Sequence, residues 1–189
     1  MTKKVSARYN ESLRVNLYKL LPILFAILWP VKSHDLIAQT LGTRNFGGYH
    51  TGIDILVPEN TPVFAICDGT VVTNNTNSYY TAFENYWNSF VIIEHDCNND
   101  IIFGYYGHIT SDITKLQKVK RGQLLGYVVM AKSILDKSTQ TGIDRPSNIQ
   151  LHFGLNKSYL RKQWGYSHSL TAVIEAGWIN PLTYLNIDN

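Results

Sequence analysis

Hydrophobic residues recur along most of this chain in short runs that are separated by turn-forming residues. The runs are GIDILV (52–57), PVFAIC (62–67), TVVT (70–73), SFVIIEH (89–95), DIIFGYYGH (100–108), LLGYVVM (124–130) and IQLHFGL (149–155). They are rich in β-branched and aromatic residues, which favour strands over helices. Asp68–Gly69 and the stretch 96–100 are hairpin signals between such runs. The pattern predicts consecutive β-strands.

Little of the chain has a helical pattern. A short helix is predicted around Ser169–Ala176, ended by Gly177. Residues 111–120 are expected to form an irregular or short helical connection before the Arg121–Gly122 turn. With 189 residues and no internal repeat, linker or low-complexity tract, the chain suits one domain with its own core. We therefore expect a mainly β fold, a single domain built on an antiparallel sheet.

The N-terminal segment differs in character from the rest. Basic residues precede an apolar run, Leu20–Trp29, that is typical of a secretory signal and short for a membrane span. Val31 and Ser33 fit a cleavage site after residue 33, whereas Lys32 between them leaves an uncleaved anchor as the alternative. We expect residues 1–33 to be a signal peptide or membrane anchor and residues 34–189 to form the β-domain. The protein would then be exported to the periplasm or cell envelope, with membrane contact only through this segment.

The formal net charge of +3 also comes from the N-terminal segment. Six basic residues and one acidic residue before His34 contribute +5, so the remainder carries −2. The β-domain therefore has no general excess of positive charge with which to attract phosphate groups. Nucleic acid is not an expected partner.

The chain has two cysteines, Cys67 and Cys97. An even number of cysteines in an exported protein favours a disulfide. If the neighbouring strands pair antiparallel, both thiols lie near the same end of the sheet. Two free thiols are the alternative.

Two long stretches, 73–88 and 131–148, do not fit the strand pattern. Loops of this length are often functional. The first contains aromatic residues that could form one wall of a substrate groove: Tyr79, Tyr80, Phe83, Tyr86 and Trp87. The alternative is that these rings pack on the edge of the sheet.

His50, Asp54 and His152 are the strongest candidates for chemistry. Two imidazoles and a carboxylate form a suitable ligand set for a catalytic Zn²⁺ that keeps one position open. In a straight strand residues 50 and 54 would be about 13 Å apart, too far to share an ion. The chain is therefore expected to bend between them, at Gly52.

His108 follows an apolar run and is suited to proton transfer or charge stabilisation beside a metal. Gln150 lies two residues before His152, so in a strand both project from the same face. The other three histidines, His34, His95 and His168, are expected to be structural. The sequence has no His-Glu-x-x-His helix, phosphate-binding glycine loop or Gly-x-Ser-x-Gly elbow.

Several segments together resemble one family. The run RNFGGYHTGIDILVPENTPVFAICDGTVV (44–72), followed by FVIIEH, YYGHIT, VKRGQLLGYV, IQLHFGL and INPLTYL, is similar to the lysostaphin-type (LytM-like) zinc metallopeptidases. The resemblance covers most of the chain after residue 43. It implies an antiparallel β-sheet with a substrate groove, zinc ligands at His50, Asp54 and His152, and a catalytic histidine at His108. It also implies hydrolysis of peptide bonds in bacterial cell-wall peptidoglycan, whose peptides would be the partner.

One position departs from the family pattern. The family has His-x-His where this chain has Gln150-Leu151-His152, and the first histidine of that pair is catalytic. A glutamine amide donates a hydrogen bond but does not accept and return a proton. The prediction is a zinc endopeptidase, with a weakly active or inactive peptidoglycan-binding or regulatory module that retains zinc as the alternative.

Overall fold

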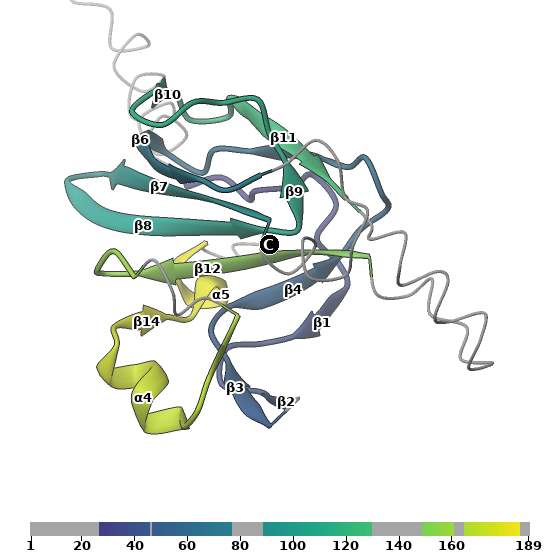
Figure 1. Cartoon of the computed structure of the whole chain (residues 1–189), viewed down its shortest axis with the longest axis vertical. Helices are drawn as coiled ribbons and strands as arrows, with labels where there is room; N and C mark the ends of the chain where they lie inside the picture. The colour runs from purple at the N-terminus through teal and green to yellow at the C-terminus, as the bar shows by residue number, and fades with distance from the viewer. Residues whose placement is uncertain (1–26, 46, 77–88, 130–148, 161–164, 186–189) are drawn as a thin grey trace, which may run out of the picture.

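The computed structural model describes residues 27–45, 47–76, 89–129, 149–160 and 165–185. Every strand pair in these ranges is antiparallel. The expected mainly β, single-domain fold is confirmed (Figure 1). None of the helices in these ranges is long and apolar enough to cross a membrane.

One large sheet forms the centre of the molecule (Figure 1). Its strands, in spatial order, are β1 (Ile37–Gln39), β4 (Ile53–Leu56), β12 (Gln150–Asn156), β8 (Asp100–Gly107), β7 (Phe90–Cys97), β6 (Asp68–Asn74) and β10 (Lys118–Val119), and β14 (Trp178–Ile179) also pairs with β12. Strands β4 and β12 are neighbours, although almost a hundred residues separate them in sequence. The two segments that carry the candidate ligands therefore meet inside the sheet.

Two smaller sheets flank the large one. The first consists of β5 (Pro62–Phe64), β11 (Leu124–Val128) and β9 (Ile109–Thr110). The second consists of β13 (Tyr166–Ser167), β3 (Gly48–His50) and β2 (Arg44–Asn45). Two short helices follow near the C-terminus, α4 (Leu170–Glu175) and α5 (Pro181–Tyr184).

The first half of β7, residues 90–93, is buried on both faces, which explains its continuous apolar sequence. Val91 and Ile93 belong to the main core, while Phe90 and Ile92 point to a second cluster. That cluster also contains Val173 of α4, and Tyr105 and Trp178. Alternate residues of a strand face opposite sides. The sheet therefore lies between two apolar clusters, and side chains of β7 pack into both.

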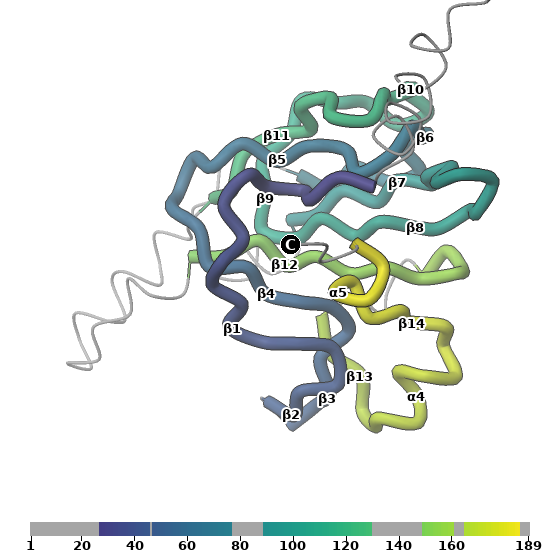
Figure 2. The backbone as a smooth tube through the Cα atoms, turned by 180° about the vertical axis from the view of Figure 1, so that it is seen from behind, coloured from purple at the N-terminus to yellow at the C-terminus, as the bar shows by residue number. Residues whose placement is uncertain are grey.

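Residues 27–31 pack on the same core. Val31 is only 1% exposed and lies in the main apolar cluster. The Leu28 amide donates to the Ile66 carbonyl at 3.1 Å, and the Phe64 amide donates to the Pro30 carbonyl at 2.8 Å. These bonds place the segment antiparallel beside β5, and Figure 2 shows it as the purple start of the described chain. Residues 28–31 therefore pack on the described β-domain.

Most predicted elements are present. The helix at 170–175 begins at the Ser169 cap, whose hydroxyl accepts from the Ala172 amide, and Gly177 follows it with φ 82°. The β7–β8 hairpin turns through Asn98 and Asn99, both left-handed, as the hairpin signal at 96–100 predicts. Helix α5 was not predicted.

The hairpin predicted at Asp68–Gly69 is wrong. Both residues lie within β6 and pair with Asp96 and His95 of β7. Glycine is needed at position 69 because an added Cβ would lie 2.6 Å from the Glu94 carbonyl oxygen. An Asp-Gly pair therefore marks close strand packing here.

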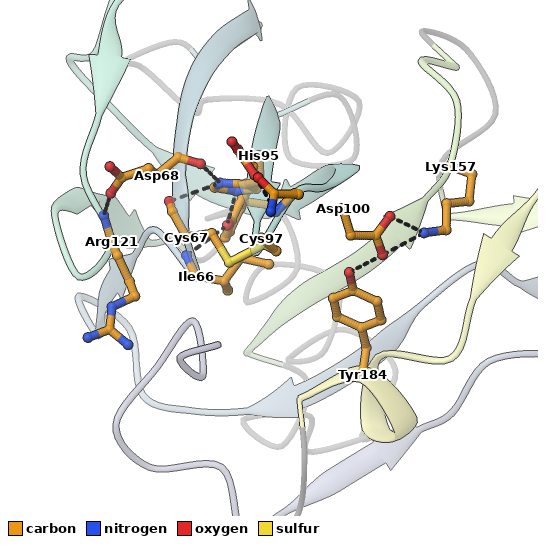
Figure 3. The surroundings of a disulfide bond; sticks show 12 residues. Ile66, Cys67, Asp68, His95, Cys97, Asp100, Arg121, Lys157 and Tyr184 are labelled. Atoms are coloured by element: carbon orange, nitrogen blue, oxygen red, sulfur yellow. Dashed lines mark hydrogen bonds and ion pairs between the residues drawn. A yellow bond between two sulfur atoms is a disulfide. The ribbon is translucent and has the colours of Figure 1, made fainter. Parts of the chain in front are cut away.

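Cys67 and Cys97 are joined by a disulfide at one end of the β6–β7 pair (Figure 3). Their Cα atoms are 5.5 Å apart and the sequence separation is 30 residues. Closing a loop of this size stabilises a fold by about 3–4 kcal/mol in the chain-entropy model. The bond holds the start of β6 against the end of β7.

His95 lies next to the disulfide and is fully buried (Figure 3). Its Nδ1 is 3.0 Å from the Cys67 carbonyl oxygen, to which it donates, and its Nε2 is 2.7 Å from the Tyr106 hydroxyl. Burial lowers the pKa of His95 from 6.5 to about 4. This histidine is structural, as the sequence indicates.

The depressed pKa of His95 predicts acid sensitivity. Between pH 6.5 and 4 the unfolded chain binds a proton that the folded chain excludes, so the free energy of unfolding falls as pH falls. The loss from pH 7 to pH 5 should be about 2 kcal/mol. Urea unfolding of the wild type and of His95→Gln at both pH values measures it. The variant should lose less stability on acidification, and an equal loss in both proteins would contradict the assignment.

Some expectations fall outside the described residues. The aromatic residues proposed to line a groove, Tyr79, Tyr80, Phe83, Tyr86 and Trp87, lie outside them, as does the stretch 131–148. Their contribution to a substrate groove stays a prediction.

Candidate metal centre

The three candidate ligands meet at one point. His50 Nε2 is 2.9 Å from His152 Nδ1 and 3.1 Å from Asp54 Oδ1, and His152 Nδ1 is 3.0 Å from the same oxygen. All three side chains are buried. Among the described residues, this is the group of histidine, cysteine and acidic side chains whose arrangement could hold a metal ion.

Strand pairing creates this convergence. His152 lies directly opposite Asp54 in the β12–β4 register, and opposite residues of an antiparallel pair have adjacent side chains. His50 ends β3, and β4 begins three residues later at Ile53. The chain bends through Thr51 and Gly52, so the expected bend is present and brings His50 back over Asp54.

The reason for glycine at position 52 differs from the one expected. Gly52 does not have a left-handed backbone. An added Cβ would lie 2.4 Å from the Phe153 carbonyl oxygen and 2.9 Å from the Gly154 Cα. Glycine is required because the bend passes directly against the backbone of β12.

The ring of His50 is held from behind by the turn at residues 40–43. Its Nδ1 lies 3.3 Å from the Thr40 carbonyl oxygen. Its backbone amide donates to the Thr43 carbonyl, and its own carbonyl accepts from the Gly42 amide. A proton on Nδ1 leaves the Nε2 lone pair free to bind a metal together with Asp54 Oδ1 and His152 Nδ1.

The electrostatics of the cluster suit a cation. Burial by itself raises the pKa of Asp54, but hydrogen bonding to His152 and His50 outweighs burial and lowers the pKa below its ordinary value. Burial lowers the pKa of His152. At neutral pH the cluster therefore offers an ionised carboxylate and a neutral imidazole, the forms that bind metals.

The donor set fits zinc. Donors that each lie about 2.0–2.2 Å from one ion cannot be more than about 4 Å apart. The three atoms here are 2.9–3.1 Å apart. Two imidazole nitrogens and one carboxylate oxygen leave a fourth tetrahedral position for water or substrate.

His108 lies beside this cluster, immediately after β8. Its ring centroid is 6.4 Å from that of His152, and the side chain is buried. Its φ is 62°, an uncommon left-handed backbone for a residue with a side chain. The Val129 amide donates to its carbonyl, and its own amide donates to the Ser89 carbonyl. These two backbone hydrogen bonds hold His108 in a conformation that costs free energy, with its ring beside His152.

Gln150 is the first residue of β12 and is partly exposed. It is two residues from His152 in the same strand, so both share one face. The remaining histidines lie elsewhere. His34 stacks on Trp29 with ring centroids 3.9 Å apart, and His168 is exposed.

The structure also places residues at the centre that no sequence pattern indicated. Thr40 supports His50, and Gln39 and Tyr166 lie opposite Asp54 and His50 in neighbouring strands. None of them belongs to a recognisable motif. They could be identified only from the register in which the strands pair, and the sequence does not give that register.

A mainly β domain in which two histidines and an aspartate converge on one point has the arrangement of a metal-binding protein. The sequence profile of peptidase family M23 matches residues 48–163, which is more than half of the chain. The protein belongs to peptidase family M23, and the resemblance to lysostaphin-type peptidases is confirmed.

Solved structures support the fold. A zinc-containing peptidase from Vibrio cholerae is 20% identical with a TM-score of 0.52, covering 86% of this chain and 40% of that one. The antimicrobial peptidase lysostaphin from Staphylococcus simulans is 18% identical with a TM-score of 0.54, covering 85% and 53%. The catalytic domain of the M23 protein EnpA from Enterococcus faecalis is 23% identical with a TM-score of 0.51, covering 86% and 99%. This chain thus spans about half of lysostaphin and less than half of the Vibrio cholerae peptidase.

Proposed function

We propose that this protein is a zinc metallopeptidase that hydrolyses peptide bonds of bacterial peptidoglycan. The observation that carries the proposal is the convergence of His50, Asp54 and His152 within 3.1 Å of one another in a member of peptidase family M23. Membership of peptidase family M23 and the sequence resemblance to lysostaphin-type peptidases support peptidoglycan peptides as the substrate class.

His50, Asp54 and His152 would hold the metal through Nε2, Oδ1 and Nδ1. Zinc bound there would polarise the scissile carbonyl and lower the pKa of a water molecule. The buried carboxylate keeps the ligand set anionic, and the Thr40 carbonyl keeps the His50 ring oriented. The chain thus supplies a preorganised set of donors.

In this proposal His108 has the proton-transfer role. Its ring lies beside His152 without being one of the three converging donors. Gln150, on the same strand face as His152, would donate a hydrogen bond to the oxyanion of the tetrahedral intermediate. It would not exchange protons, so hydrolysis should be slow for a metallopeptidase.

Export completes the proposal. The Cys67–Cys97 disulfide suits an oxidising compartment, and the basic and apolar N-terminal segment is typical of exported proteins. Packing of Val31 and of residues 28–30 beside β5 favours retention of the segment around residue 33 as part of the folded domain. This packing disfavours cleavage after Ser33.

Gln150 supports a second candidate function, a peptidoglycan-binding or regulatory module that keeps zinc and cleaves slowly or not at all. The two functions share the metal and differ in turnover. Digestion of purified peptidoglycan by the full chain, with and without a chelator, separates them. We expect chelator-sensitive release of new amino termini and one zinc per chain. Peptidoglycan binding with one zinc and no release would favour the module.

A further inference from the structure

The strands opposite two of the proposed ligands carry side chains that meet each other. Tyr166 of β13 pairs with His50 of β3, and Gln39 of β1 pairs with Asp54 of β4. These pairs lie in different sheets. His50 and Asp54 therefore each have a neighbour on the strand next to their own, away from β12.

The two neighbours are joined by a hydrogen bond. The Tyr166 hydroxyl donates to Gln39 Oε1 at 3.0 Å, across 127 residues of sequence. The Tyr166 ring also lies against His50, with ring centroids 5.2 Å apart at 45°. These contacts, together with the strand pairing of Gln39 and Asp54, link Tyr166 and Gln39 to both proposed ligands.

The chain next to Gln39 also contacts the His50 ring directly. Gln39 is followed by Thr40, whose carbonyl oxygen lies 3.3 Å from His50 Nδ1. A shift of β1 would therefore move both the strand partner of Asp54 and the acceptor that orients His50. A hydrogen bond that fixes β1 restrains two of the three donors together.

We propose that the Tyr166–Gln39 hydrogen bond is a clasp that positions His50 and Asp54 for metal binding. It rests on the proposed zinc centre and makes Tyr166 a positioning residue, since it acts through His50 and is not one of the three converging donors. Interactions that orient metal ligands typically contribute 10- to 100-fold to affinity. The clasp thus contributes zinc affinity through a side chain that lies outside the family's motifs.

The test is Tyr166→Phe, which removes only the hydroxyl. Zinc affinity of the full chain is measured by competition with a chromophoric chelator. We expect the dissociation constant to rise by about 10-fold. The matched control is Tyr159→Phe, because the Tyr159 hydroxyl bonds to Thr73 Oγ1 at 2.8 Å and contacts none of the proposed ligands. The control should leave the dissociation constant unchanged.

A double-mutant cycle with Gln39→Ala tests the partnership. If the clasp acts as one unit, the double variant should bind zinc no more weakly than the weaker single variant. A dissociation constant for Tyr166→Phe equal to that of Tyr159→Phe would overturn the proposal. Because the readout is metal affinity, a wild-type chain that binds zinc but cleaves no peptidoglycan would sink the peptidase function and leave the clasp intact.

Discussion

Replacing His152 by alanine should abolish stoichiometric zinc binding and, with it, hydrolysis of peptidoglycan. His152 Nδ1 lies 2.9 Å from His50 Nε2 and 3.0 Å from Asp54 Oδ1, so its removal leaves two donors. Zinc sites with four ligands bind with about 10–16 kcal/mol. One ligand therefore corresponds to about 3–4 kcal/mol, or a 10²- to 10³-fold weaker affinity.

The measurement is metal content after dialysis, followed by release of amino termini from peptidoglycan. His168→Ala is the matched control, because it removes an exposed imidazole that lies outside the cluster. It should retain one zinc per chain and full activity. Circular dichroism checks that His152→Ala keeps its β-sheet. A folded His152→Ala variant that still holds zinc as tightly as the control would show that the ligand assignment is wrong.

Replacing Gln150 by histidine should raise the rate of peptidoglycan hydrolysis. The position lies on the same strand face as His152 and is partly exposed, so an imidazole has room to reach a substrate. A positioned general acid or base typically contributes 10²–10⁴-fold to the rate. We expect a gain of about that size in kcat, with zinc content unchanged because residue 150 is not one of the three donors.

Gln150→Asn is the matched control for this gain. It keeps an amide and changes only the length of the side chain, so it should not accelerate hydrolysis. Combining Gln150→His with His108→Ala shows whether the two imidazoles act together, in which case the gain should be lost. A wild-type chain as fast as Gln150→His would mean that the glutamine does not limit the reaction. Slow or absent hydrolysis by both would favour the binding module.

The sequence by itself determined the mainly β fold and the residue types of the candidate site. Apolar runs rich in β-branched residues report strands, because side-chain burial on a sheet selects them locally. The run FVIIEH predicted β7. Ser169 at one end and Gly177 at the other predicted helix α4. His50, Asp54 and His152 could be chosen because few residue types bind zinc.

Only the tertiary structure decided which strands are neighbours and what surrounds the ligands. Register between β4 and β12, almost a hundred residues apart, brings His152 opposite Asp54. Close approach to the backbone of β12 explains Gly52, where conformational freedom was the expected reason. The Tyr166–Gln39 bond joins residues 127 apart. Local sequence carries no signal for such contacts, because they depend on how distant strands pack and not on the propensity of any one segment.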